Sequence, residues 1–239
     1  MSKLPRQSLL DDAGLNRQHV FDLAGLPAEV LGPMDPWAQE TQLILFAHAG
    51  RRLWDRVQAR RAGGELASSH PIDEHTVQTI RQWLEQALPG AHARFVYPFG
   101  LPEARHVGLQ SLGSLAGWHH PSPFMVGIDA TWGSWFAYRA VLLTDTALPA
   151  SAAVDLGHPC PSCADKPCIT ACAGQALGSG TMDMQACLRQ RLAEPSPCAL
   201  ACVARAACPV GAEHRYDLSQ VEHSGRGSLA AIRRLAARR

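Results

Sequence analysis

The chain has 239 residues, 46% of them hydrophobic, and a formal net charge of +1. This composition excludes a largely disordered chain, and the balanced charge excludes a uniformly basic surface of the kind that binds nucleic acid in bulk. No run approaches the roughly 20 apolar residues of a membrane helix. The N-terminus has no basic-then-apolar signal pattern, so we expect a cytoplasmic protein without membrane contact.

Hydrophobic periodicity predicts alternating helices and strands over the first 150 residues. In chain order we expect a helix at His19–Ala24, a strand at Leu43–Ala49, helices at Arg51–Arg61 and Asp73–Leu88, a strand at Ala93–Phe99, a helix at Glu103–Ala116, and strands at Phe124–Ile128 and Trp135–Thr144. The helix at Asp73–Leu88 has the strongest periodicity, with Asp73 as its expected N-cap. Such alternation is typical of an α/β layer structure.

The composition changes twice along the chain, which predicts three parts. Residues 1–150 form the α/β domain, residues 151–217 hold every cysteine, and residues 218–239 form a basic helix. The arginines of this helix are Arg226, Arg233, Arg234, Arg238 and Arg239. They suit contact with RNA or an acidic electron donor, although a solvated helix face is the common role of such a run.

All eight cysteines lie between residues 160 and 208, in the order four, one, three. They are Cys160, Cys163, Cys168, Cys172, Cys187, Cys198, Cys202 and Cys208. Disulfides are disfavoured in the cytoplasm, where thiols stay reduced. Four thiolates complete the shell of one 4Fe–4S cluster or one structural zinc, so eight suit two such centres.

Two 4Fe–4S clusters fit the cysteine spacing better than two zinc ions. In two-cluster ferredoxins, three cysteines of one tight loop bind one cluster and the fourth cysteine of that block binds the other. This crossing predicts one set of Cys160, Cys163, Cys168 and Cys208, and a second set of Cys172, Cys187, Cys198 and Cys202. Zinc favours two close pairs, but C-x2-C occurs once here. Zinc sites and redox-sensing thiols remain the alternatives.

Several stretches resemble epoxyqueuosine reductases. The segment CPSCADKPCITACAGQA at 160–176 resembles their first cluster block, and DMQACLRQRL at 183–192 resembles the segment that supplies their single intermediate cysteine. Upstream, Ala116-Gly117-Trp118 resembles their AGLGW stretch, and TWGSWF at 131–136 resembles their WGSWF stretch. The order of the cysteines, four, one, three, is also the same.

The resemblance implies an oxidoreductase that depends on cobalamin and is related to reductive dehalogenases. Its fold would be an α/β (α+β) corrinoid-binding domain followed by a ferredoxin-like domain with two 4Fe–4S clusters. Electrons would come from a donor such as a ferredoxin or flavodoxin, and the substrate would be a modified tRNA or a small molecule. By position, the corrinoid pocket would include Gly117, Trp118, Ser122, Gly133, Ser134, Trp135 and Phe136. Glycine turns and ordinary core packing are the alternative roles of these residues.

The sequence departs from the family at the place of its proton-donating aspartate. That segment reads VYPFG at 96–100, without a carboxylate, and Glu103 is the nearest one. The sequence therefore identifies no general acid. This departure favours a second hypothesis, a dicluster electron carrier without a substrate of its own.

Overall fold

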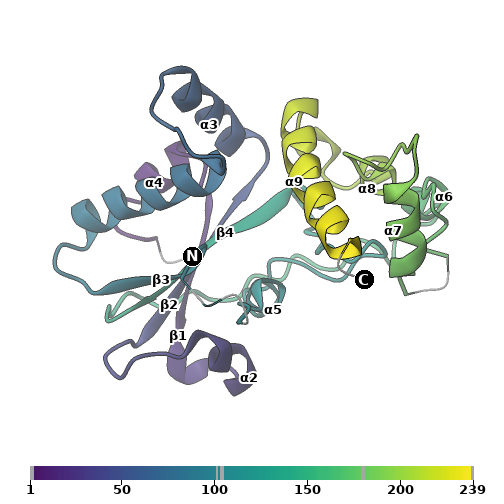
Figure 1. Ribbon diagram of the computed structural model, residues 1–239. Coiled ribbons are helices and arrows are strands. Elements are labelled where there is room, and N and C mark those ends of the chain that lie inside the picture. Colours follow the sequence, from purple (N-terminus) through teal and green to yellow (C-terminus); the bar gives the residue numbers. More distant parts are fainter. Residues whose placement is uncertain (1–2, 101, 103–104, 179–180, 238–239) are drawn as a thin grey trace. The chain divides into compact units, whose positions relative to one another are not determined.

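The computed structural model describes residues 3–100, 102, 105–178 and 181–237 (Figure 1). The chain divides into two compact units. Unit 1 comprises residues 1–118 and 136–155, and unit 2 comprises residues 119–135 and 156–239. Residues 119–135 thus join the second unit, although they precede the boundary expected near residue 150, and the C-terminal helix joins it too. The mixed α/β character of the chain is confirmed.

Unit 1 is built on a four-stranded antiparallel sheet with the strand order β1-β2-β4-β3. The strands are β1 (Arg17–Asp22), β2 (Gln42–Ala49), β3 (Ala93–Tyr97) and β4 (Phe136–Thr144). Every residue of β2 is buried, because apolar layers cover both faces of the sheet. Successive side chains of a strand point to opposite faces. Phe46 therefore packs in one layer with Trp83, and Leu45 packs in the other with Leu112.

Helices supply the rest of both layers. They are α1 (Gln7–Asp12), α2 (Ala28–Leu31), α3 (Arg52–Ala62), α4 (Pro71–Ala87) and α5 (Leu109–Leu115), with short 3₁₀ turns at Leu23–Gly25 and Gly32–Met34. Helices α3 and α4 lie on one face of the sheet, and α2 and α5 lie towards the other (Figure 1). Helix α4 begins at Pro71 after His70, so Asp73 lies in its first turn and is not its N-cap. Proline has a backbone angle suited to the first helical position.

Two of the expected elements are wrong. The helix expected at His19–Ala24 is instead β1, which pairs with β2 from Arg17 opposite Ala47 to Asp22 opposite Gln42. Buried β2 needs a hydrogen-bond partner along this edge, and that requirement overrides local helical periodicity. The strand expected at Phe124–Ile128 is a loop, in which Met125 has φ 65° and only Ile128 forms a bridge, to His120. The helix expected from Glu103 begins at Leu109, and Glu103 lies outside the described residues.

Unit 2 consists of short helices joined by loops. The helices are α6 (Pro167–Thr170), α7 (Met184–Leu192), α8 (Val203–Ala207) and α9 (Leu218–Ala236), with a 3₁₀ turn at Ala212–His214. Helix α9 packs against α7 and begins at the N-cap Asp217, whose carboxylate accepts a hydrogen bond from the Gln220 amide at 2.8 Å. Among the described residues, none of the helices could cross a membrane.

Two glycines join the loop at 131–134 to the loop at 209–212. Gly133 has φ 59° and Gly211 has φ 63°, a region that favours glycine. A Cβ atom on Gly133 would lie 2.1 Å from the Val210 carbonyl oxygen. This close backbone contact fixes residues 119–135 within unit 2.

We expect Gly133→Ala to destabilise unit 2. Its methyl group would meet the Val210 carbonyl, and such overpacking costs about 1–3 kcal/mol in addition to the backbone strain. The control is Gly157→Ala, because Gly157 also has positive φ, 87°, but has nothing within 4 Å of its added Cβ. Denaturant unfolding of both variants separates the two costs. Equal losses in the two variants would contradict the close contact.

Candidate metal centres

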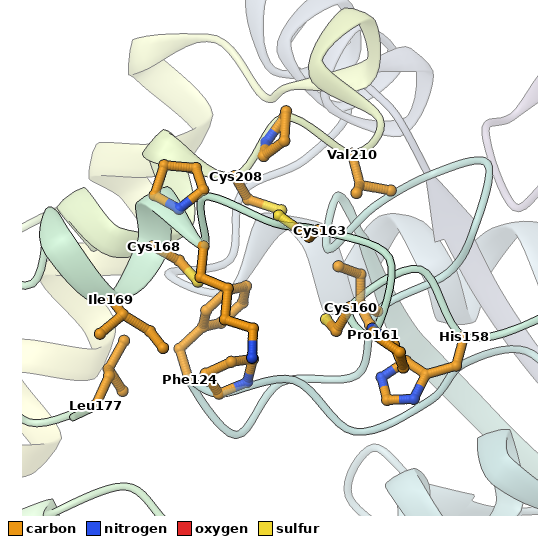
Figure 2. A pocket seen from close by; sticks show the side chains of 15 residues that line it. Phe124, His158, Cys160, Pro161, Cys163, Cys168, Ile169, Leu177, Cys208 and Val210 are labelled. Carbon is orange, nitrogen blue, oxygen red and sulfur yellow. The ribbon is translucent and has the colours of Figure 1, made fainter. Parts of the chain in front are cut away.

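The eight cysteines of unit 2 surround two separate cavities, four to each. The first cavity has a volume of about 300 Å³ and is lined by Cys160, Cys163, Cys168 and Cys208 (Figure 2). The second has a volume of about 440 Å³ and is lined by Cys172, Cys187, Cys198 and Cys202. These are the two sets expected from the crossing pattern. All eight thiols are free of disulfides, and their role as metal ligands stays a prediction.

Helices α6 and α8 distribute cysteines between the two cavities. Cys168 lies in the first turn of α6 and faces the first cavity, whereas Cys172 follows the end of α6 and lines the second. Cys202 is the N-cap of α8 and Cys208 is its C-cap. The two ends of one short helix therefore serve different cavities, which is the structural basis of the crossing.

The first cavity is otherwise mainly apolar. Phe124, Ile128 and Leu177 line it, and they form the core of this part of unit 2 together with Cys168 and Cys208. Figure 2 shows the four cysteines spaced around this cavity. Apolar walls exclude water and lower the local dielectric constant, which strengthens electrostatic interactions inside.

The thiols in each set influence one another's charge. Burial raises the pKa of the Cys160 thiol, and it is raised further by Cys208, Cys168 and Cys163. Burial likewise raises the pKa of the Cys187 thiol, and its other thiol neighbours are Cys202, Cys172 and Cys198. Four thiolates in one set repel each other, so they can all ionise only when a positive partner neutralises them.

Backbone amides point at two sulfurs of the second set. The Ala176 amide donates to Cys172 Sγ at 3.3 Å, and the Arg205 amide donates to Cys202 Sγ at 3.5 Å. Hydrogen bonds to sulfur stabilise the thiolate and are one of the means by which proteins adjust iron–sulfur reduction potentials.

Arginine side chains hold the cysteine loops in place, and no local sequence pattern predicts this role. Arg191 of α7 donates to the carbonyl oxygens of Cys198 and Ala199, both at 3.3 Å, and to Ser228 Oγ of α9 at 2.9 Å. Arg215 donates to the Cys208 carbonyl at 3.0 Å. The bonds from Arg191 thus position the second set of cysteines, and the bond from Arg215 positions the first set.

Each set of four cysteines lines a cavity with room for more than one atom. One zinc ion with four sulfurs at about 2.3 Å fills the volume between its ligands. Here the four cysteines of each set are among the residues that line cavities of about 300 and 440 Å³. In the part of the chain that the structure describes, no three His, Cys, Asp or Glu side chains are grouped to hold a single metal ion.

The expected corrinoid-pocket residues are divided between the units. Gly117, Trp118 and Phe136 belong to unit 1, and Ser122, Gly133, Ser134 and Trp135 belong to unit 2. In unit 1 the guanidinium of Arg17 lies 4.7 Å from the Trp118 ring centroid and 5.3 Å from that of Phe136. Each residue thus has packing neighbours in its own unit, and corrinoid binding stays a prediction.

In the segment without a carboxylate, Val96 and Pro98 are buried and only Phe99 and Gly100 are exposed. Phe99, within the segment 96–100, has 75% of its surface accessible and a φ of 70°. No general acid is identified there, and Glu103 is outside the described residues.

No protein-family model and no curated protein matches the sequence. Solved structures match the fold at low identity. An epoxyqueuosine reductase with an epoxyqueuosine-modified tRNA-Tyr stem loop is 13% identical with a TM-score of 0.53, covering 91% of this chain and 68% of that one. The C. elegans B12-trafficking protein CblC is 15% identical with a TM-score of 0.52, covering 92% and 90%. The catabolic reductive dehalogenase NpRdhA is 14% identical with a TM-score of 0.52, covering 94% and 33%.

The chain has the fold of the epoxyqueuosine reductases. The resemblance seen in the sequence is therefore confirmed at the level of fold. Sequence identities of 13–15% show the fold alone. The chain spans about two thirds of the length of the epoxyqueuosine reductases that it matches.

We expect the thiols of the metal-free chain to react slowly at neutral pH. Alkylating reagents attack thiolate, and a raised pKa leaves less thiolate at a given pH. The pH midpoints for alkylation of Cys160 and Cys187, followed by mass spectrometry, should lie above those of the same residues in urea. Because the folded pKa exceeds the unfolded one, the free energy of unfolding should fall as pH rises above about 8.5. Midpoints at or below the unfolded values would contradict this grouping.

Proposed function

We propose that this chain is an iron–sulfur oxidoreductase with two 4Fe–4S clusters that passes electrons to a corrinoid. One observation carries the proposal: eight cysteines sort into two sets of four around two cavities. The fold shared with epoxyqueuosine reductase and a reductive dehalogenase supports a reductase. Free thiols fit a reducing compartment, so we place the protein in the cytoplasm.

The residues around each cavity fit a cluster. Each set offers four soft sulfur ligands, and arginine side chains hydrogen-bond the loops that carry them. When bound, clusters supply one-electron relay and a corrinoid supplies a strongly reducing cobalt. The chain itself contributes the ligands, the apolar walls around Phe124 and Ile128, and the amide donors to Cys172 and Cys202.

The corrinoid part of the proposal rests on the shared fold. Two fold neighbours, CblC and epoxyqueuosine reductase, support a corrinoid-type scaffold, and the neighbour with a tRNA stem loop supports tRNA as one class of substrate. A small molecule is the other class, and a ferredoxin or flavodoxin is the proposed electron donor. The basic helix α9 offers less free charge than its sequence suggests, because Arg226 pairs with Glu222 at 2.8 Å and Arg233 pairs with Glu194 at 3.1 Å.

The second candidate function is an electron carrier without its own substrate. The segment 96–100, which lacks a carboxylate, favours this candidate. Both candidates need the two clusters, and only the reductase needs the corrinoid. Corrinoid binding therefore separates them.

Anaerobic reconstitution should load about eight irons and eight sulfides per chain. Cys208→Ser and Cys202→Ser, at opposite ends of α8, should each remove about half, because each belongs to a different set. Ser162→Ala, next to Cys163, is the control and should keep the full content. Metal and sulfide analysis with circular dichroism measures the outcome. Zinc without sulfide would refute the clusters, and loss of all iron from a folded variant would refute the division into sets.

Cobalamin should bind the reconstituted chain with micromolar or tighter affinity and give a cob(II)alamin signal in electron paramagnetic resonance. Trp118→Phe should weaken binding, because the smaller phenyl ring offers less aromatic area for a corrinoid ring to pack on. Trp37→Phe is the control, since Trp37 is 49% exposed and is outside the proposed pocket. Without binding at micromolar concentration, the electron carrier becomes the better account.

A further inference from the structure

Trp135 places a hydrogen-bond donor without a partner in the wall of the second cavity. The side chain is 4% exposed, and its Nε1 is buried without a hydrogen-bond acceptor among the described residues. The ring lines the cavity together with the four cysteines of the second set. A buried N–H is seldom left unsatisfied, because its removal from water is then not compensated.

Arg205 places a cation in the same wall. Its guanidinium lies 4.3 Å from the Trp135 ring centroid and 5.2 Å from that of Tyr216. Its Nε donates to Ser134 Oγ at 3.1 Å, and its Nη2 donates to the Ser134 carbonyl. These contacts fix the guanidinium beside the cavity.

No carboxylate of the described residues pairs with Arg205. None of the ion pairs within the described ranges includes Arg205. Burial lowers the pKa of the Arg205 guanidinium, whereas Tyr216 and Cys202 favour its charged form. A partly buried cation needs an anion nearby, and the space next to it is the thiol-lined cavity.

We propose that Trp135 Nε1 and the Arg205 guanidinium form an anion-binding wall that donates to sulfur atoms of the second cluster and raises its reduction potential. This inference rests on the proposed function, because it requires that cluster. A 4Fe–4S core with four thiolates is an anion, and reduction makes it more negative. A fixed cation and a fixed N–H donor therefore stabilise the reduced form more than the oxidised form.

The test is a redox titration, followed by electron paramagnetic resonance, of the reconstituted full chain. Trp135→Phe keeps an aromatic ring and removes the N–H, and Arg205→Gln removes the charge. Each should lower the electron affinity of the second cluster about tenfold, or about 59 mV for a one-electron couple. Each variant is also measured in a Cys208→Ser background. This change disrupts the first set of cysteines, so that the remaining signal can be assigned to the second cluster.

Two matched controls should leave the potential unchanged. Arg189→Gln removes an exposed charge of α7 that does not line the cavity. Trp132→Phe changes a neighbouring indole whose ring lies 4.2 Å from His214 and outside the cavity wall. A shift of equal size in these controls would overturn the inference.

The outcomes separate this inference from the proposed function. A wild-type chain that forms no second cluster refutes the proposed function. A second cluster whose potential stays the same in both Trp135→Phe and Arg205→Gln overturns only the inference. If the Arg205→Gln variant cannot assemble the cluster, Arg205→Lys should restore assembly because it keeps the charge. In that case the reduction potential of the Trp135→Phe variant decides whether the inference holds. Failure of both arginine variants together with an unshifted Trp135→Phe potential also overturns the inference.

Discussion

Four thiols packed around one cavity repel one another once they lose their protons, and unit 2 contains this arrangement twice. Burial and neighbouring sulfur raise the pKa values of Cys160, Cys168, Cys187 and Cys198. The other features of unit 2 hold the thiols in place despite this repulsion. Arg191 and α9 hold the second set through carbonyl and side-chain contacts, and the apolar core surrounds the first. A cofactor that accepts electron density from sulfur would convert this unfavourable crowding into binding energy.

Close backbone contacts, more than a large apolar core, determine how unit 2 is assembled. Gly133 meets the Val210 carbonyl, and a Cβ atom on Gly225 of α9 would lie 1.8 Å from the Leu200 carbonyl oxygen. Leu200 and Gly225 both line the second cavity, so this contact seats the helix as part of its wall. Glycine permits both approaches because it has no side chain. Short helices can then present cysteines at their ends, where the direction of the chain changes sharply and neighbouring side chains point to different places.

Local sequence patterns predicted the helices and strands whose own apolar residues are buried. They missed the features that depend on contacts with residues far away in the sequence. The apolar run of β2 and the helical spacing of α4 were sufficient by themselves. Strand β1 depends on the open edge of β2, which no window around His19 contains. The crossing pattern of two-cluster ferredoxins matches the way the cysteines line the two cavities, and their sharing of a metal centre stays a prediction. Arg205 could not be predicted, because nearly every cation in this chain is an arginine and its role depends on Ser134 and Trp135.

If the two proposed clusters form, the cysteines at the two ends of α8 would bind one cluster each and bring their charges near one another. Cys202 and Cys208 bound a single helix and are six residues apart, which corresponds to about 9 Å of helix rise. At about 10 Å and an effective dielectric constant of about 20, two unit charges interact by about 1.7 kcal/mol. That energy exceeds the 1.4 kcal/mol of a tenfold change in equilibrium, so an electron on one cluster would disfavour a second electron on its neighbour. In the proposed function such a pair would relay single electrons, and a fixed cation beside one cluster, such as Arg205, would then decide which cluster is reduced first.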